Sequence, residues 1–288
     1  MDRIQEALQL AVEERWVGAQ ARGAQARREP PRRDPVEVEA RLRLSADKPS
    51  WLAHALPPPE PGEAQKKPHP TPLGCARPAE PRLIAADLEN PQREAYCLLH
   101  SAISRQLAVT EGRFLGLTSP RSGRGKTLTA MNLAVSLARE AGNKALLVDL
   151  NLRRPKISHF FDRIPTAGVE GCLFGGVDLE EALFVTSIDG LQVLAARGGS
   201  QNAAQVLQSE NLKLLLADIR ARYCDFITIV DLPALNAPGD AQAFESLVDA
   251  ILLVVEDEVT RETDLKLALA DLDKSKLIGT VLNNSRSL

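Results

Sequence analysis

The chain is poor in the features that mark secreted, zinc-binding and membrane-spanning proteins. Its 288 residues include four cysteines, which are scattered and form no Cys-x-x-Cys pair. His100 is the one histidine close to a cysteine in sequence, and no further partners complete a metal-binding set around it. The cysteine spacing indicates reduced thiols and argues against a disulfide or zinc framework.

Long apolar runs and an excess of positive charge are also missing. No apolar stretch approaches the roughly 20 residues that span a bilayer, and the first residues lack the apolar core of a signal peptide. The formal net charge is −3, whereas dedicated nucleic-acid-binding proteins usually carry a basic excess. We therefore expect a soluble cytoplasmic protein that does not bind nucleic acid.

Proline is unevenly distributed, and this divides the chain into three segments. Residues 1–17 predict a short amphipathic helix with one apolar side. Such a helix is marginal alone in water, so it docks on a partner or on its own domain, or it frays. Thirteen of the 19 prolines lie in residues 30–81. We predict a disordered Pro-rich linker over residues 18–82, because this composition cannot bury enough apolar surface to offset its ordering entropy.

Residues 83–288 have the pattern of one α/β domain. Five short apolar runs have the form of strands buried on both faces: 114–117, 145–149, 226–231, 250–255 and 277–282. Helices are predicted near 94–107, 127–141, 210–221, 241–248 and 262–272. Strands that are apolar on both faces belong to parallel sheets with helices on each side. The sequence predicts a doubly wound, mostly parallel sheet that binds its ligand at the carboxyl ends of the strands.

A phosphate-binding loop is the most specific motif in this domain. The segment Gly123-Arg124-Gly125-Lys126-Thr127 stands between the first apolar run and a predicted helix. Glycines let backbone N–H groups approach phosphate oxygens, and the helix N-terminus adds its positive dipole end. Lys126 can reach the β and γ phosphates, and the Thr127 hydroxyl can bind Mg²⁺. The strict motif has glycine where this chain has Pro120, so a glycine-rich turn without a nucleotide stays the alternative.

Two predicted strands end in a carboxylate at the edge where the phosphate loop lies. Asp149 ends the run 145–149, and Asp231 ends the run 226–231. A single Asp in such a place is often a turn or cap residue. Phosphoryl chemistry, however, needs Mg²⁺ to neutralise phosphate oxygens and a carboxylate to orient the metal. We therefore predict that Asp231 takes the metal-side role.

Four motifs follow one recognisable order along the chain. They are Ser119-Pro120-Arg121-Ser122-Gly123-Arg124-Gly125-Lys126-Thr127 with Asn132-Leu133-Ala134, Asp149-Leu150-Asn151-Leu152-Arg153-Arg154-Pro155, Asp231-Leu232-Pro233-Ala234 with Asp240-Ala241, and Gly279-Thr280-Val281-Leu282-Asn283. Together they resemble the motifs S-x-x-P-G-E-G-K-[ST], D-x-D-x-R-x-P, D-[ST]-P-P…D-A and G-V-V-L-N of the bacterial tyrosine kinases of capsule and exopolysaccharide systems, which are relatives of the MinD/ParA ATPases. The resemblance covers about residues 83–284 and implies a P-loop NTPase of the MinD/ParA-like class.

The resemblance also implies a site for ATP and Mg²⁺. Lys126, Asp149 and Asp231 are the expected catalytic residues, and Thr127, Asp149 and Asp231 are the expected metal ligands. The expected nucleotide contacts are Ser122, Gly123, Arg124, Gly125, Lys126, Thr127, Leu128 and Asn283. A membrane polysaccharide co-polymerase, or chain-length determinant protein, is the expected partner and would recruit the protein to the inner membrane. Assembly into a homo-oligomer is a further expectation of the resemblance.

The chain departs from the family pattern at four places. Beside Asp231, Leu232 and Ala234 replace a hydroxyl residue and a proline. Asn151 replaces the second Asp of D-x-D, and its amide can bind a metal through oxygen but cannot accept a proton. Cys97 and His100 stand where the family's E-x-x-R-x-x-R oligomerisation helix carries arginines. The only tyrosines are Tyr96 and Tyr223, so the family's C-terminal tyrosine cluster is missing. We expect autophosphorylation to be weak or absent.

Three functions stay open on the sequence alone. The leading hypothesis is an ATP-dependent tyrosine-kinase-family protein of exopolysaccharide biosynthesis, which transfers or hydrolyses the γ-phosphate. The second is a nucleotide-binding regulatory module that controls a polysaccharide-assembly partner with little phosphotransfer. The third is a ParA/MinD-like ATPase, for which Arg121 lies near the place of that group's signature lysine.

Overall fold

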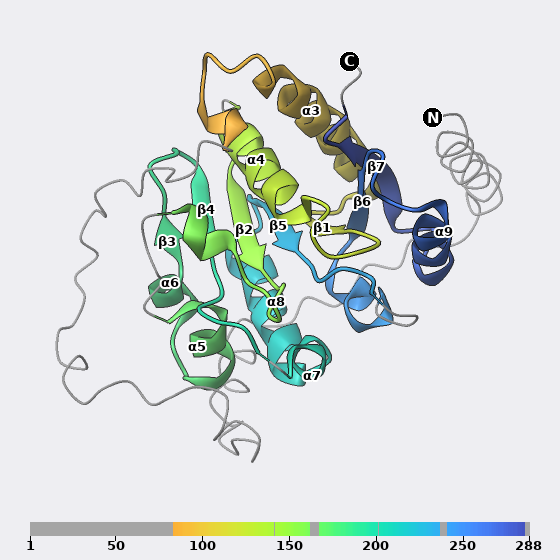
Figure 1. Ribbon diagram of the computed structural model, residues 1–288. Coiled ribbons are helices and arrows are strands. Elements are labelled where there is room, and N and C mark those ends of the chain that lie inside the picture. Colours follow the sequence, from red (N-terminus) through yellow and green to blue (C-terminus); the bar gives the residue numbers. More distant parts are fainter. Residues whose placement is uncertain (1–82, 141, 162–166, 201, 237–240, 286–288) are drawn as a thin grey trace, which may run out of the picture.

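The computed structural model describes residues 83–285, apart from residues 141, 162–166, 201 and 237–240 (Figure 1). The expected amphipathic helix of residues 1–17 and the expected linker of residues 18–82 lie outside the described residues, as does Asp240. None of the described helices has the length and apolar character that a bilayer crossing requires.

Seven strands and seven α-helices are present in the described residues. The strands are β1 (Phe114–Thr118), β2 (Ala145–Asp149), β3 (Phe184–Val185), β4 (Leu191–Leu194), β5 (Ile227–Asp231), β6 (Ala250–Glu256) and β7 (Leu277–Asn283). The α-helices are α3 (Arg93–Thr110), α4 (Lys126–Ala138), α5 (Gly168–Phe174), α6 (Leu179–Ala182), α7 (Ala203–Leu207), α8 (Glu210–Arg222) and α9 (Glu262–Asp271). Short 3₁₀ turns are η2 (Ile84–Ala86), η3 (Ile157–Phe160), η4 (Ala241–Ala243) and η5 (Glu245–Leu247).

The strands form one sheet in the order β3-β4-β2-β5-β1-β6-β7. Every neighbouring pair is parallel except β3 and β4. The predicted doubly wound, mostly parallel sheet is therefore confirmed. Because β1, β2 and β5 run the same way, the loops that follow them meet at one edge of the sheet (Figure 1).

Each face of the sheet has its own apolar core, because alternate side chains of a strand point to opposite faces. In β2, Leu146 and Val148 belong to the core that α5 to α9 cover. Ala145 and Leu147 belong to the other core, which α3 and α4 cover (Figure 1). All four side chains are fully buried, which explains why the sequence of this strand is apolar throughout.

The helix predicted over residues 241–248 is wrong, since the structure has the two 3₁₀ turns η4 and η5 there. Ala241, Phe244 and Leu247 are all buried. Their spacing of three residues suits a 3₁₀ helix, in which side chains three apart line up. Backbone bonds from Phe244 N to Ala241 O and from Leu247 N to Phe244 O follow the same spacing. Burial on a three-residue repeat decided the local structure here.

The sequence analysis does not predict β4. This strand has only four residues, and it is placed by parallel pairing with β2, in which Ala145 lies opposite Leu191. The short helices α5, α6 and α7 are likewise not predicted, because four to seven residues are too few to show a helical period.

Candidate active site

The phosphate loop joins β1 to α4 at the carboxyl edge of the sheet. Gly123 and Gly125 take the left-handed conformation, with φ of 86° and 84°, which glycine adopts without a steric cost. A Cβ on Gly125 would lie 2.0 Å from the Asn283 amide nitrogen, so this position also needs glycine for close packing. Pro120 replaces the first glycine of the strict motif, and its ring fixes a negative φ. The loop therefore makes its left-handed turns at the two later glycines.

Lys126, Thr127 and Asp231 form a buried polar cluster below this loop. The Lys126 ammonium lies 3.0 Å from Asp231 Oδ1, and the Thr127 hydroxyl donates to Asp231 Oδ2 at 2.6 Å. All three residues are buried. The cluster joins the start of α4 to the end of β5, so the structure brings these three predicted site residues together.

Asp149 lies beside this cluster, directly opposite Asp231 in the pairing of β2 with β5. Its carboxylate accepts hydrogen bonds from the backbone N–H groups of Asn151, at 3.1 Å, and Ile157, at 3.3 Å. Burial, and next the negative charge of Asp231, raise the pKa of the Asp149 carboxyl to about 7, against the opposing effect of Lys126. A carboxyl with such a pKa can exchange a proton near neutral pH.

The oxygen atoms of this cluster suit Mg²⁺. A hydroxyl and carboxylates are the hard ligands that this ion prefers, and Mg²⁺ is commonly held by one or two carboxylates together with substrate phosphates. In the described part of the chain, no group of three or more His, Cys, Asp and Glu could hold a metal alone. The hydroxyl of Thr127 and the carboxylate of Asp231, with Asp149 alongside, fit an ion that phosphate oxygens also hold.

Asn151 makes a contact that the family's aspartate could not make. Its side-chain amide donates to the carbonyl oxygen of Arg154 at 3.0 Å, and Arg154 N donates to Asn151 O at 2.9 Å. A carboxylate has no proton to donate at neutral pH. The Asn therefore closes the turn that follows β2, in addition to removing a possible proton acceptor.

A second set of contacts fastens the loop to the ends of β6 and β7. Arg124 Nη1 lies 2.7 Å from Glu256 Oε2, and the Asn283 amide donates to Arg124 O at 3.2 Å. Asn284 also donates to Glu256. The sequence analysis misses Glu256, although this residue ends an apolar strand as Asp149 and Asp231 do. The same strand-end signal could have found it.

The remaining predicted contacts lie along the loop and the first turn of α4. Ser122 is exposed and donates to Asn236 Oδ1 at 3.4 Å, a long hydrogen bond. Leu128 is half-buried, and its carbonyl accepts from the Asn132 amide. Neither side chain joins the cluster around Asp231.

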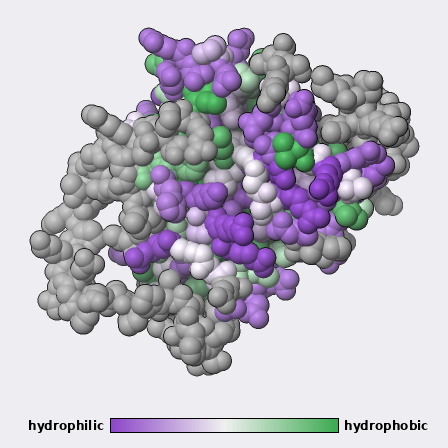
Figure 2. Space-filling view, viewed as in Figure 1, coloured by the Kyte–Doolittle hydropathy of each residue, from purple (hydrophilic) through white to green (hydrophobic). Residues whose placement is uncertain are grey.

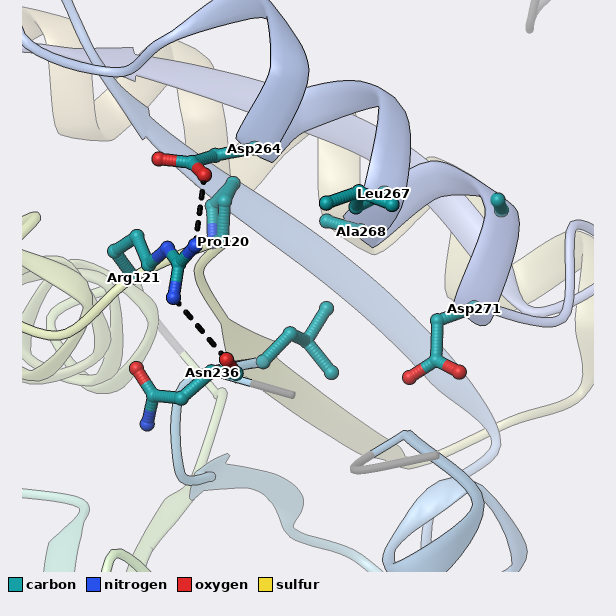
Figure 3. A pocket seen from close by; sticks show the side chains of 9 residues that line it. Pro120, Arg121, Asn236, Asp264, Leu267, Ala268 and Asp271 are labelled. Atoms are coloured by element: carbon teal, nitrogen blue, oxygen red, sulfur yellow. Dashed lines mark hydrogen bonds and ion pairs between the residues drawn. The ribbon is translucent and has the colours of Figure 1, made fainter. Parts of the chain in front are cut away.

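Arg121 points toward α9 on the outer flank of the loop (Figure 3). Its guanidinium lies 2.9 Å from Asp264 Oδ1 and donates to the backbone oxygen of Asn236 at 3.1 Å. A cavity of about 270 Å³ lies beside it and is lined by Pro120, Leu235, Leu267 and Ala268, among others. Arg121 is therefore engaged in an ion pair within its own chain.

Comparisons with known proteins identify the family of this chain. The family model described as ATPase MipZ matches residues 113–274, which is more than half of the chain. The tyrosine-protein kinase YwqD of Bacillus subtilis (strain 168) is 34% identical over 173 residues, which cover 59% of this chain and 71% of YwqD. The chain belongs to the bacterial tyrosine kinase family.

Two more matches show how much of the chain resembles known proteins. The succinoglycan biosynthesis transport protein ExoP of Rhizobium meliloti (strain 1021) is 31% identical over 189 residues, which cover 64% of this chain but only 24% of ExoP. The crystal structure of the chimerical protein CapA2B2 matches with a TM-score of 0.64 and 28% identity, covering 71% of this chain and 90% of the chimera. The described domain thus shares most of the chimera's fold, and the ATPase MipZ family model matches within the same part of the chain.

Helix α3 of this chain lacks the arginines of the corresponding helix in its family and makes other contacts. His100 is buried, with Nδ1 2.8 Å from the Ser136 hydroxyl and Nε2 3.0 Å from Glu140 Oε2. These contacts join α3 to α4. His100 therefore serves packing within the domain.

Proposed function

We propose that the chain is a Mg²⁺-dependent, ATP-binding phosphotransferase of the bacterial tyrosine kinase family that acts in exopolysaccharide or capsule biosynthesis. The names of its relatives support this function, since YwqD is a tyrosine-protein kinase and ExoP is a succinoglycan biosynthesis protein. The observation that carries the proposal is the buried cluster of Lys126, Thr127 and Asp231 below a glycine loop. Phosphoryl transfer depends mainly on positioning and on neutralising phosphate charge, and this cluster supplies the groups for both.

The proposed roles follow from the chemistry of each side chain. Lys126 and the loop amides of residues 122–128 hold the phosphates, and Thr127 and Asp231 hold Mg²⁺, which neutralises phosphate charge when bound. Asp149 accepts the proton of the acceptor hydroxyl or assists at the metal. Asn283 contacts the loop at Arg124 O, and we place the nucleotide base on its side of the loop.

Residues 83–288 form the proposed nucleotide-binding unit. The proposed partner is a membrane polysaccharide co-polymerase, or chain-length determinant protein, that recruits this unit to the inner membrane from the cytoplasm. The length of ExoP supports such a partner, since the matched segment is only 24% of that transport protein. We place the chain in the same kind of assembly, as one module of a larger machine.

A nucleotide-binding regulatory module is the second candidate, and Asn151 favours it. The amide of Asn151 is committed to the turn through Arg154 O, so it adds no proton acceptor beside Asp149. A chain with one carboxylate in this place would bind nucleotide and transfer phosphate slowly. Rates of phosphate release and of phosphotyrosine formation, measured on the same sample, separate the two candidates.

Thermal unfolding with Mg-ATP tests the shared core of both candidates. A ligand at one hundred times its dissociation constant stabilises the folded state by about 2.7 kcal/mol, which raises the melting temperature of a domain of this size by about 5–10 °C. Lys126→Ala should lose most of this rise. The control is Lys144→Ala. Lys144 is exposed, pairs with Asp225, and directly precedes β2, so it lies at the edge of the sheet opposite the phosphate loop. An equal ligand-induced rise in melting temperature in both variants would show that Lys126 does not bind the phosphates.

A further inference from the structure

Two loops on the β4 side of the site carry four exposed basic side chains. Arg153, Arg154 and Lys156 follow β2, and Arg197 follows β4. We call these four residues the basic rim. In the space-filling view, hydrophilic side chains gather on the surface beyond the end of β2 (Figure 2). The carboxylate of Asp149 accepts from Asn151 N and Ile157 N, so three of the rim residues lie in the loop that this carboxylate closes.

The second loop is fastened to the first. Ser200 N donates to Leu152 O at 2.7 Å, and a Cβ on Gly199 would lie 3.0 Å from Arg153 O. Arg197 N and Gly198 N donate to the carboxylate of Glu170, which holds this loop on α5. The basic rim therefore stands on two loops that backbone contacts hold in place.

The basic rim differs from the other arginines of this edge in lacking a carboxylate partner. Arg121 pairs with Asp264, and Arg124 pairs with Glu256. Among the described residues, no rim side chain lies within ion-pair distance of a carboxylate. The Glu170 carboxylate accepts from the backbone N–H groups of Arg197 and Gly198, and it also interacts electrostatically with the Arg197 side chain without forming an ion pair. Four exposed positive charges that form no ion pair with a described carboxylate attract anionic ligands to this side of the site.

The sheet order places the basic rim on the side of the loop away from Asn283. The order β4-β2-β5-β1-β6-β7 puts Asn283 at one end and Arg197 near the other. Neighbouring strands lie about 4.8 Å apart, so the end of β4 is roughly 14 Å from the end of β1. With the nucleotide phosphates on the loop, the acceptor must approach Asp149 from the rim side.

The chain's own tyrosines are poorly placed to be the acceptor. Burial raises the pKa of the Tyr96 hydroxyl, which bonds to Thr129 and Asn132. Tyr223 packs edge-on against Phe226, with ring centroids 5.1 Å apart. Tyr223 also precedes β5, so it lies at the amino edge of the sheet, about 16 Å of strand away from the site. The acceptor therefore belongs to another molecule.

We propose that the basic rim is the acceptor-binding site, and that the acceptor is a tyrosine-bearing segment of another protein in which acidic residues flank the tyrosine. In an extended segment, residues two to four positions from the tyrosine lie about 7–14 Å from it, so acidic residues there would reach the two rim loops, which follow the neighbouring strands β2 and β4. This assignment of the acceptor site rests on the proposed phosphotransferase function. In the transfer, the tyrosine oxygen forms a bond to the γ-phosphorus, the bond from that phosphorus to the bridging oxygen of ADP breaks, and the phenolic proton passes to Asp149.

Two synthetic peptides test the proposal. Both have one tyrosine, flanked by four Glu in the first and by four Gln in the second. Phosphate transfer from Mg-ATP and binding in the presence of Mg-ADP, followed by fluorescence anisotropy, are measured on the full chain. We expect the Glu peptide to bind and react about tenfold or more better at low salt, and to lose this preference at high salt.

The charge-reversed variant R154E/K156E/R197E should lose the preference through a higher KM for the Glu peptide. The matched control is K144E/K213E/K266E, which changes the net charge equally at exposed lysines that pair with acids elsewhere. A control that loses the preference as fully would show a general charge effect and overturn the proposal. Thermal unfolding of both variants confirms that they fold.

The two readouts separate the acceptor site from the proposed function. If neither peptide is phosphorylated, but the Glu peptide still binds preferentially through the rim, the acceptor site stands and phosphotransfer fails. If both peptides are phosphorylated and bound equally, phosphotransfer stands and the acidic acceptor is wrong. If a DNA duplex of equal charge displaces the Glu peptide at a lower concentration, the rim is a general polyanion surface, and the acceptor proposal is also wrong.

Discussion

The contact between Lys126 and Asp231 makes a quantitative prediction about the nucleotide-free protein. The side chains of this pair are 6% and 0% exposed, and Asp149 lies next to them in the neighbouring strand. Lys126→Met keeps most of the apolar stem and removes the ammonium, which leaves two buried carboxylates facing each other. Removing one partner of a buried pair costs about 3–5 kcal/mol. For a domain of this size, we expect the melting temperature to fall by about 6–20 °C.

The double variant Lys126→Met with Asp231→Asn tests the cause of this loss. If an uncompensated carboxylate is responsible, neutralising Asp231 should recover more than half of the stability, and the two changes should be strongly non-additive. Thermal unfolding at about pH 8, with a chelator and without nucleotide, is the measurement. The loss should be smaller near pH 6, because Asp149 is then protonated and one negative charge is gone. A single variant as stable as the parent, or a double variant no better than the single, would refute the reasoning.

Four further predictions concern the same edge of the sheet. Burial above all raises the pKa of the Asp149 carboxyl to about 7. The folded protein therefore binds the carboxyl proton more tightly than the unfolded chain does, and the free energy of unfolding should fall as pH rises toward 7. Mg-ADP must displace the proton, so its affinity in calorimetry should rise up to about pH 7 and then level off, and Asp149→Asn should remove that slope. Asn151→Asp restores a second carboxylate, and we expect several-fold faster phosphate release without phosphotyrosine. The same change removes the hydrogen bond from the Asn151 side chain to Arg154 O, which should lower the melting temperature by about 2–4 °C. Gly125→Ala should abolish the Mg-ATP-induced rise in melting temperature, whereas Gly123→Ala, with a similar φ but nothing within 4 Å of its Cβ, should keep more of it.

Local rules predicted most of the sheet. The five apolar runs correspond to β1, β2, β5, β6 and β7, because strands covered on both faces are apolar without interruption. The same reasoning placed Asp149 and Asp231 at strand ends, and the glycine loop before α4. These features depend on residues that are neighbours in sequence, so a single sequence contains them.

The sequence by itself determined five of the seven described strands and the phosphate loop, whereas tertiary contacts decided how the site is assembled. Lys126 meets Asp231 across 105 positions of the chain, and Asn283 meets the loop across 159. The pairing of Asp149 with Asp231, and of the loop after β2 with the loop after β4, depends on strand order. The three-residue repeat of η4 and η5 likewise depends on which side chains the core buries. No local pattern carries this information, because strand order and burial are properties of the folded sheet.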